Sequence, residues 1–156
     1  MSEQVVASIG DESSSIQLRI HGRQFPGVSG WDGEWLIVEC QAKLGDQSWA
    51  FRSSCLLAGE LASLIAWLRA IADERDGILD PRLEFMEPTI GFSFERMSSA
   101  EILLAVEFTL EGSPPWWDSM GHQSGEGLRP FVISMKVGPD ELRRAAADLE
   151  STAPDV

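Results

Sequence analysis

The sequence predicts an α+β protein: a curved, mostly antiparallel sheet of seven to eight strands packed on one long helix, with a short helix at the C-terminus. Two observations lead to this fold class. Over most of the chain, apolar residues alternate with polar ones at a period of two, which is typical of strands with one buried face. Only residues 58–74 and the segment after Pro139 carry apolar residues at helical spacing. The strands follow one another without regular intervening helices, which argues against a parallel, doubly wound sheet.

Three strands are predicted before the long helix. Residues 16–20 alternate strictly, and residues 36–44 place apolar side chains on one face. A shorter strand over residues 49–51 follows. The turn residues Gly45 and Asp46 predict a hairpin between these last two strands.

A long amphipathic helix is predicted over residues 58–74. Its apolar stripe consists of Leu57, Leu61, Leu64, Ile65, Leu68 and Ile71. Glu60 lies near the N-terminus, where a carboxylate stabilises the positive end of the helix dipole. Trp67 lies one position off the stripe and is expected at its edge. Asp76-Gly77 predicts the end of the helix.

Strands return after this helix. Apolar positions alternate over residues 83–85, 90–94, 102–110 and 131–137. The last segment predicts a short helix from Pro139, because proline suits a first turn and the acidic residues after it favour the positive end of the dipole.

The length of 156 residues predicts a single domain over residues 1–156. The sequence shows no internal repeat and no low-complexity linker. Residues 1–14 and 151–156 are expected to be frayed. Cys40 and Cys55 lie within or beside apolar runs and have no metal-binding spacing, so we expect small buried side chains in a reducing compartment.

The chain is strongly acidic, with 25 Asp and Glu against 12 Lys and Arg and a formal net charge of −13. This charge repels nucleic acid and anionic membranes, so we expect neither as a partner, whereas a basic partner would be attracted. The same charge would equally serve solubility alone. The start MSEQVVASIGDESSS lacks the features of a signal peptide, and no apolar run has a membrane-spanning length. These features predict a cytoplasmic protein.

The polar positions of the strands predict an acidic side of the sheet. These positions alternate with the apolar ones and are Glu39, Gln41, Glu84, Glu95, Glu107, Thr109 and Glu111. Any half-buried sheet presents polar residues to water, so a plain solvated face and a binding face are both open.

The segment EGSPPWWDSM places two tryptophans after two prolines in a loop. Neighbouring residues of an extended chain point in opposite directions, so Trp116 and Trp117 cannot both be buried on one face. At least one ring is therefore expected to be partly exposed. It would either contact a protein partner, with Asp118 as a neighbouring carboxylate, or form a lid over the end of the core. Trp49, in contrast, is expected in the core.

Catalytic motifs are absent from the sequence. His21 and His122 have no second ligand at metal-binding spacing, and neither phosphate-binding loops nor a nucleophile elbow occur. Asp32 and Glu34 would be the carboxylate pair of a glycosidase, but acids two residues apart are common. We therefore expect no enzyme, no cofactor and no metal.

Five phrases in order resemble one known family: HGRQFPG, WDGEWLIV, SWAFRSSCLLAGELASLIAWL, LEFMEPTIGFSF and EGSPPWW. Together they are similar to bacterial immunity proteins of the WapI family over about residues 15–150. The resemblance implies a protein that binds and neutralises a cognate toxin domain, often a nuclease. A nuclease is basic around its phosphate site, so an acidic inhibitor would be steered to it.

This resemblance, together with the acidic face and the tryptophan loop, predicts the partner-binding residues. They are Glu107, Glu111, Trp116, Trp117, Asp118, Glu39 and Glu95. The alternative is a non-catalytic binding or accessory module of unknown ligand, with no toxin partner. An exposed tryptophan pair would also suit a homodimer.

Overall fold

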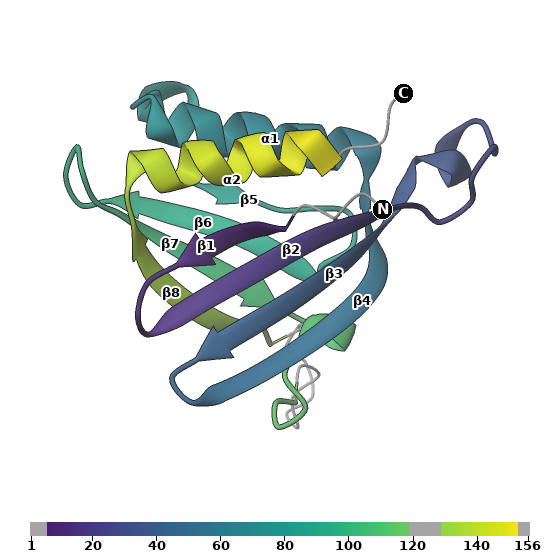
Figure 1. The fold of residues 1–156 in the computed structure, drawn as a ribbon, viewed down its shortest axis with the longest axis horizontal. Coiled ribbons are helices and arrows are strands. Elements are labelled where there is room, and N and C mark those ends of the chain that lie inside the picture. Colours follow the sequence, from purple (N-terminus) through teal and green to yellow (C-terminus); the bar gives the residue numbers. More distant parts are fainter. Residues whose placement is uncertain (1–5, 119–128, 153–156) are drawn as a thin grey trace.

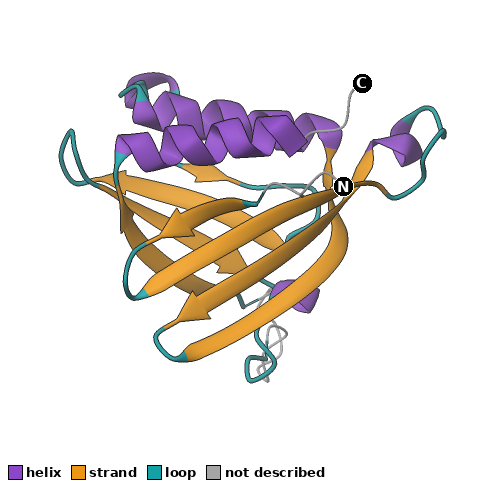
Figure 2. Cartoon of the chain, viewed as in Figure 1, coloured by secondary structure: helices purple, strands orange, loops and turns teal. Residues whose placement is uncertain are grey.

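The computed structural model describes residues 6–118 and 129–152 and shows two antiparallel sheets with two helices (Figures 1 and 2). The first sheet has four strands in the order β1-β2-β3-β4. Their bounds are Ala7–Gly10, Ser14–Arg23, Trp35–Leu44 and Gln47–Leu57. The hairpin predicted at Gly45-Asp46 joins β3 to β4, and Gly45 adopts the positive φ of 61° that this turn requires.

The second sheet also has four strands, in the order β5-β6-β7-β8. Their bounds are Arg82–Leu83, Ile90–Arg96, Ile102–Phe108 and Phe131–Val137. Apolar side chains of both sheets form one hydrophobic core, in which the alternating residues of every long strand are buried. The prediction of an α+β fold is confirmed, but the prediction of one curved sheet is wrong.

The two helices are of similar length and pack against each other across one end of the sheets (Figure 1). Helix α1 spans Ala58–Ala72 and helix α2 spans Pro139–Thr152. The prediction of one long and one short helix is therefore wrong, although both predicted starts are correct. The guanidinium of Arg69 on α1 forms a two-point ion pair with Glu150 on α2, at 2.8 and 3.1 Å.

The order of elements repeats: four antiparallel strands and a helix are followed by four more strands and a second helix. No repeat is visible in the sequence. Each helix packs on the sheet of the other half. In front in Figure 1, α2 contacts β1 and β2, while Trp67 of α1 stacks on Phe92 and Phe94 of β6, with centroids 6.3 and 5.5 Å away.

This exchange explains the position of Trp67. The ring was expected at the edge of the apolar stripe, but it is only 4% exposed, because the second sheet covers that side of α1. Its Nε1 donates to the carbonyl of Asp80 at 2.9 Å. At the start of α1, Glu60 accepts the N–H of Leu57 at 3.0 Å and that of Met86 at 2.7 Å, so it fixes the loop before β6 to the helix.

Three boundaries differ from the prediction. Residues 7–10 form β1, so fraying of residues 1–14 does not hold for this part; the strand is too short to show a clear period. Residues 151 and 152 belong to α2. Leu110 continues the apolar alternation of residues 102–108 but leaves the strand with a φ of 53° and is exposed, at the start of the short helix η3 (Leu110–Gly112).

Candidate functional site

A cluster of aromatic rings closes the end of the core opposite the helices. Trp49 on β4 lies at its centre, buried as predicted. Its ring makes edge-to-face contacts with Phe108, Phe131 and Trp116, with centroids 5.2, 5.5 and 5.6 Å away. Its Nε1 donates to the carbonyl of Gly112 at 3.0 Å. Trp49 therefore joins the first sheet to β7, β8 and η3.

The predicted tryptophan pair lies on this cluster. Trp116 is 46% exposed, while Trp117 is half-buried, so the prediction that at least one ring is partly exposed is confirmed. The chain is not extended here: the N–H of Trp117 donates to the carbonyl of Pro114 at 3.0 Å, and this turn brings both rings against Phe131. The guanidinium of Arg129 lies 3.9 Å from the centre of the Trp117 ring. Asp118 follows, half-buried.

Glu111 joins η3 to two other segments. Its Oε1 accepts hydrogen bonds from Ser53 Oγ on β4 and from Thr89 Oγ1 before β6, each at 2.9 Å. Partial burial disfavours the charged carboxylate, but the hydrogen bonds from its own backbone, Ser53 and Thr89 outweigh that effect and lower the pKa of Glu111. This carboxylate therefore stabilises the contact between the two sheets.

Glu39 lies on the outer face of the first sheet, on β3. It pairs across the strands with Arg19 and Arg52, and its Oε1 lies 3.1 Å from His21 Nε2 and 3.5 Å from Arg19 Nη1. The hydrogen bond with His21 is the main cause that lowers the pKa of Glu39, and the charges of Arg19 and Arg52 add to it. This face of the sheet holds more cations than carboxylates around Glu39.

Glu107 and Glu95 lie on the outer face of the second sheet. Glu107 Oε2 forms an ion pair with Arg82 Nη2 at 3.1 Å, and its side chain is 22% exposed. Glu95 is exposed, and within the described residues it has no ion pair. The predicted acidic positions are thus divided between two sheets and η3, and the structure brings the tryptophans together but not the carboxylates.

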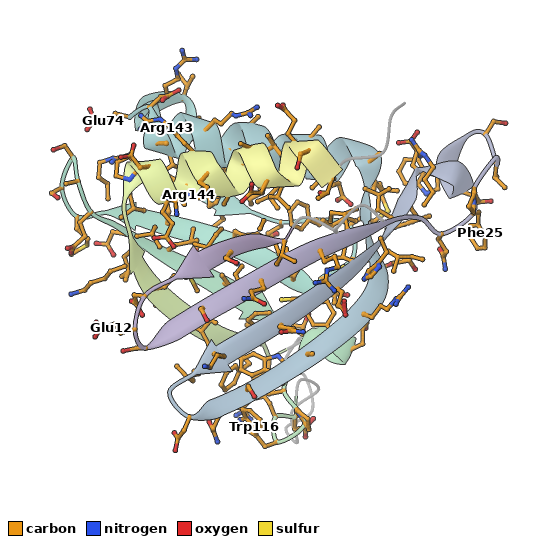
Figure 3. All side chains as sticks on the ribbon, in the orientation of Figure 1. Glu12, Phe25, Glu74, Trp116, Arg143 and Arg144 are labelled. Atoms are coloured by element: carbon orange, nitrogen blue, oxygen red, sulfur yellow. The ribbon has the colours of Figure 1, made fainter. Side chains whose placement is uncertain are left out.

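Sequence reasoning missed the loop between β2 and β3, residues 24–34, which extends away from the sheets beside the start of α1 (Figure 1). It exposes three large apolar side chains, Phe25, Val28 and Trp31. In Figure 3 Phe25 on this loop and Trp116 on the aromatic cluster lie at different ends of the molecule. The signal available was a run that loses the period-two pattern and contains Pro and three Gly around apolar residues.

The described residues were also searched for chemistry. Among residues 6–118 and 129–152, no group of three or more His, Cys, Asp or Glu side chains is placed to hold a metal ion. His122 lies outside these residues. Cys40 and Cys55 are free and buried, as predicted, and burial raises the pKa of both thiols. Within the same residues, no helix combines the length and apolar character needed to cross a bilayer.

Comparison with solved structures finds a similar fold in plants. A plant transcriptional regulator, PBF-2, shares 12% identity at a TM-score of 0.51, covering 99% of this chain and 82% of its own. WHY1 from Arabidopsis thaliana shares 10% identity at a TM-score of 0.48, covering 99% and 91%. At such identity the likeness concerns the fold alone. No curated protein sequence matches the chain.

Comparison with protein families gives a match over nearly the whole chain. The model of the immunity protein WapI-like family covers residues 7–153, from the first strand to the end of the last helix. It includes both sheets, both helices, the tryptophan loop and the β2–β3 loop. The chain therefore belongs to the WapI-like family of immunity proteins.

Proposed function

We propose that this protein is a cytosolic immunity protein that binds a cognate bacterial toxin domain and blocks its active site. Membership in the WapI-like family over residues 7–153 is the observation that carries the proposal. Inhibition by occupation needs a complementary surface rather than catalytic groups.

The proposed partner is a basic toxin domain, such as a nuclease. The net charge of −13 gives this chain a long-range attraction for a positively charged active site. Such an attraction raises the rate of association more than the final affinity. The rate constant of association should therefore fall as salt rises, because ions screen charges beyond about 8–10 Å.

The predicted contact residues differ in what they can offer. Trp116 and Glu95 are exposed, so they can reach a partner without giving up a contact within the described residues that an ion pair would cost. Glu39, Glu107 and Glu111 already hold internal partners and would contribute mainly to the local field. Trp117 and Asp118, half-buried beside Trp116, complete the proposed loop contact.

The decisive experiment is co-expression with the toxin domain encoded next to the gene of this chain. We expect protection of growth, a one-to-one complex on size exclusion and slower association in 0.5 M salt than in 0.05 M salt. A neighbouring toxin that kills cells despite this chain, and does not bind it, would support the accessory-module alternative instead. A salt-independent association rate would remove charge from the mechanism.

A further inference from the structure

We propose that the β2–β3 loop, residues 24–34, is the main toxin-binding element of this protein, and that it inserts into an apolar pocket with a basic rim. The inference rests on the proposed function and names the surface through which it acts. It differs from the tryptophan end described above.

Exposed apolar side chains are concentrated on this loop. Phe25, Val28 and Trp31 are 47%, 48% and 58% exposed, and they fall within seven residues of each other. Single exposed apolar residues are common on protein surfaces, but a group of large ones marks an interaction site. Tryptophan and phenylalanine also bury about 150–250 Å² each, which makes them effective anchors.

The backbone of the loop is fixed by its own sequence. Phe25-Pro26-Gly27-Val28 forms a type II turn: the N–H of Val28 donates to the carbonyl of Phe25 at 3.3 Å, and Gly27 has a φ of 80°. Gly33 packs directly on this turn, since a Cβ there would lie 1.8 Å from the carbonyl oxygen of Val28.

The base of the loop is closed as well. The N–H of Gln24 donates to the carbonyl of Trp35 at 2.9 Å, and the guanidinium of Arg23 donates to the carbonyl of Gly33. A loop held in one conformation loses little entropy when it binds, so its exposed rings can convert burial into affinity.

The charges beside these rings select the partner. Asp32 and Glu34 lie on the short helix η1 (Trp31–Glu34), next to the exposed Trp31. Within residues 6–118 and 129–152, neither carboxylate forms a salt bridge or a side-chain hydrogen bond. Two uncompensated carboxylates around an apolar tip complement a pocket lined with apolar groups and rimmed by Lys or Arg. A second copy of this acidic chain would instead be repelled.

The neighbouring surface enlarges the apolar area. A groove of about 560 Å³ runs along α1 and begins at Leu36, which follows the loop on β3. Ala58, Ala62, Ala66 and Ala70, one helical turn apart, keep it open. A stable interface buries about 800 Å² on each partner, more than three loop side chains supply, and the groove offers the additional apolar surface.

The test compares two exposed ends of the same fold. The double variant Phe25→Ala/Trp31→Ala, Trp116→Ala, and the control Met97→Ala, another side chain more than half exposed, are measured against an inactive form of the neighbouring toxin domain. We expect the loop variant to weaken the Kd at least 30-fold, or about what one hot-spot residue contributes. The control should stay within about threefold, as should each variant's melting temperature within a few degrees.

Each outcome decides between surfaces. Wild-type binding that the loop variant retains, while Trp116→Ala loses it, overturns the loop proposal and leaves the proposed function intact. A wild-type dimer that the loop variant dissociates assigns the loop to a second copy and also overturns the proposal. If the wild-type chain neither binds nor protects, the proposed function fails, and the partner named here fails with it. Asp32→Lys adds a direct check: it should slow association and weaken its salt dependence.

Discussion

Trp49 is the residue whose replacement tests the packing of the two sheets most directly. Its ring is 7% exposed and meets Phe108 and Phe131 of the second sheet edge to face. Trp49→Ala would leave a cavity between the sheets, and such truncations of buried tryptophan cost about 3–5 kcal/mol of unfolding free energy. This is a large part of the about 5–15 kcal/mol that a domain of ordinary stability possesses.

A second substitution separates the ring from its hydrogen bond. Trp49→Phe keeps an aromatic ring but removes the Nε1 donor, and it leaves the carbonyl of buried Gly112 without this partner. An unsatisfied buried acceptor costs about 1–3 kcal/mol. We therefore expect Trp49→Phe to fall between the wild type and Trp49→Ala.

Urea unfolding, followed by far-ultraviolet circular dichroism, measures these differences independently of tryptophan fluorescence. Trp31→Ala, at an exposed tryptophan, is the matched control and should change the free energy of unfolding by less than about 0.5 kcal/mol. A Trp49→Ala variant within 1 kcal/mol of the wild type would refute the assignment of Trp49 as the link between the sheets. A Trp49→Phe variant equal to the wild type would refute the role of its hydrogen bond alone.

Three further outcomes are expected. The lowered pKa of Glu111 means that its carboxylate stabilises the fold above about pH 4.3, its ordinary value, and that this contribution is lost as pH falls through the lower folded value; the gap in stability between wild type and Glu111→Gln should therefore be largest near pH 7 and close below pH 4. Burial raises the pKa of Cys55 to about 12 and that of Cys40 further, so neither thiol should react with a thiol reagent at pH 8 until urea unfolds the chain; fast native reaction would contradict their burial. Gly33→Ala places a Cβ against the Val28 carbonyl, so it should weaken toxin binding while the melting temperature of the body changes little; unchanged binding would show that the loop adapts.

Much of the fold could be read from the sequence because burial imposes a local period. The alternation in β3 and β7 identified the buried face of each strand, and the helical spacing located α1 to within two residues of its observed end. Alternation does not state which sheet a strand joins, however. The same pattern fits one sheet of eight strands or two of four, and only the hydrogen-bonded pairs distinguish them.

The candidate site was harder to predict, because the partners of a charge are set by tertiary structure. Glu39 and Glu107 both follow the polar alternation, yet they lie on different sheets and pair with Arg19 and Arg82. Nothing local to either residue indicates that pairing. The exposure of Phe25 was equally hidden, since an apolar residue near glycines reads the same whether its loop folds onto the core or away from it.

The crossed placement of the helices has a consequence for how the chain reaches its fold. Each half supplies the helix that covers the strands of the other, with Trp67 on β6 and α2 on β1 and β2. A fragment ending after α1 would leave its sheet without that cover, and so would one starting at β5. Two such fragments should be largely unstructured apart and should regain native circular dichroism only on mixing. Fragment complementation would then report on both halves at once, and thermal melting of the intact chain should proceed in one cooperative step.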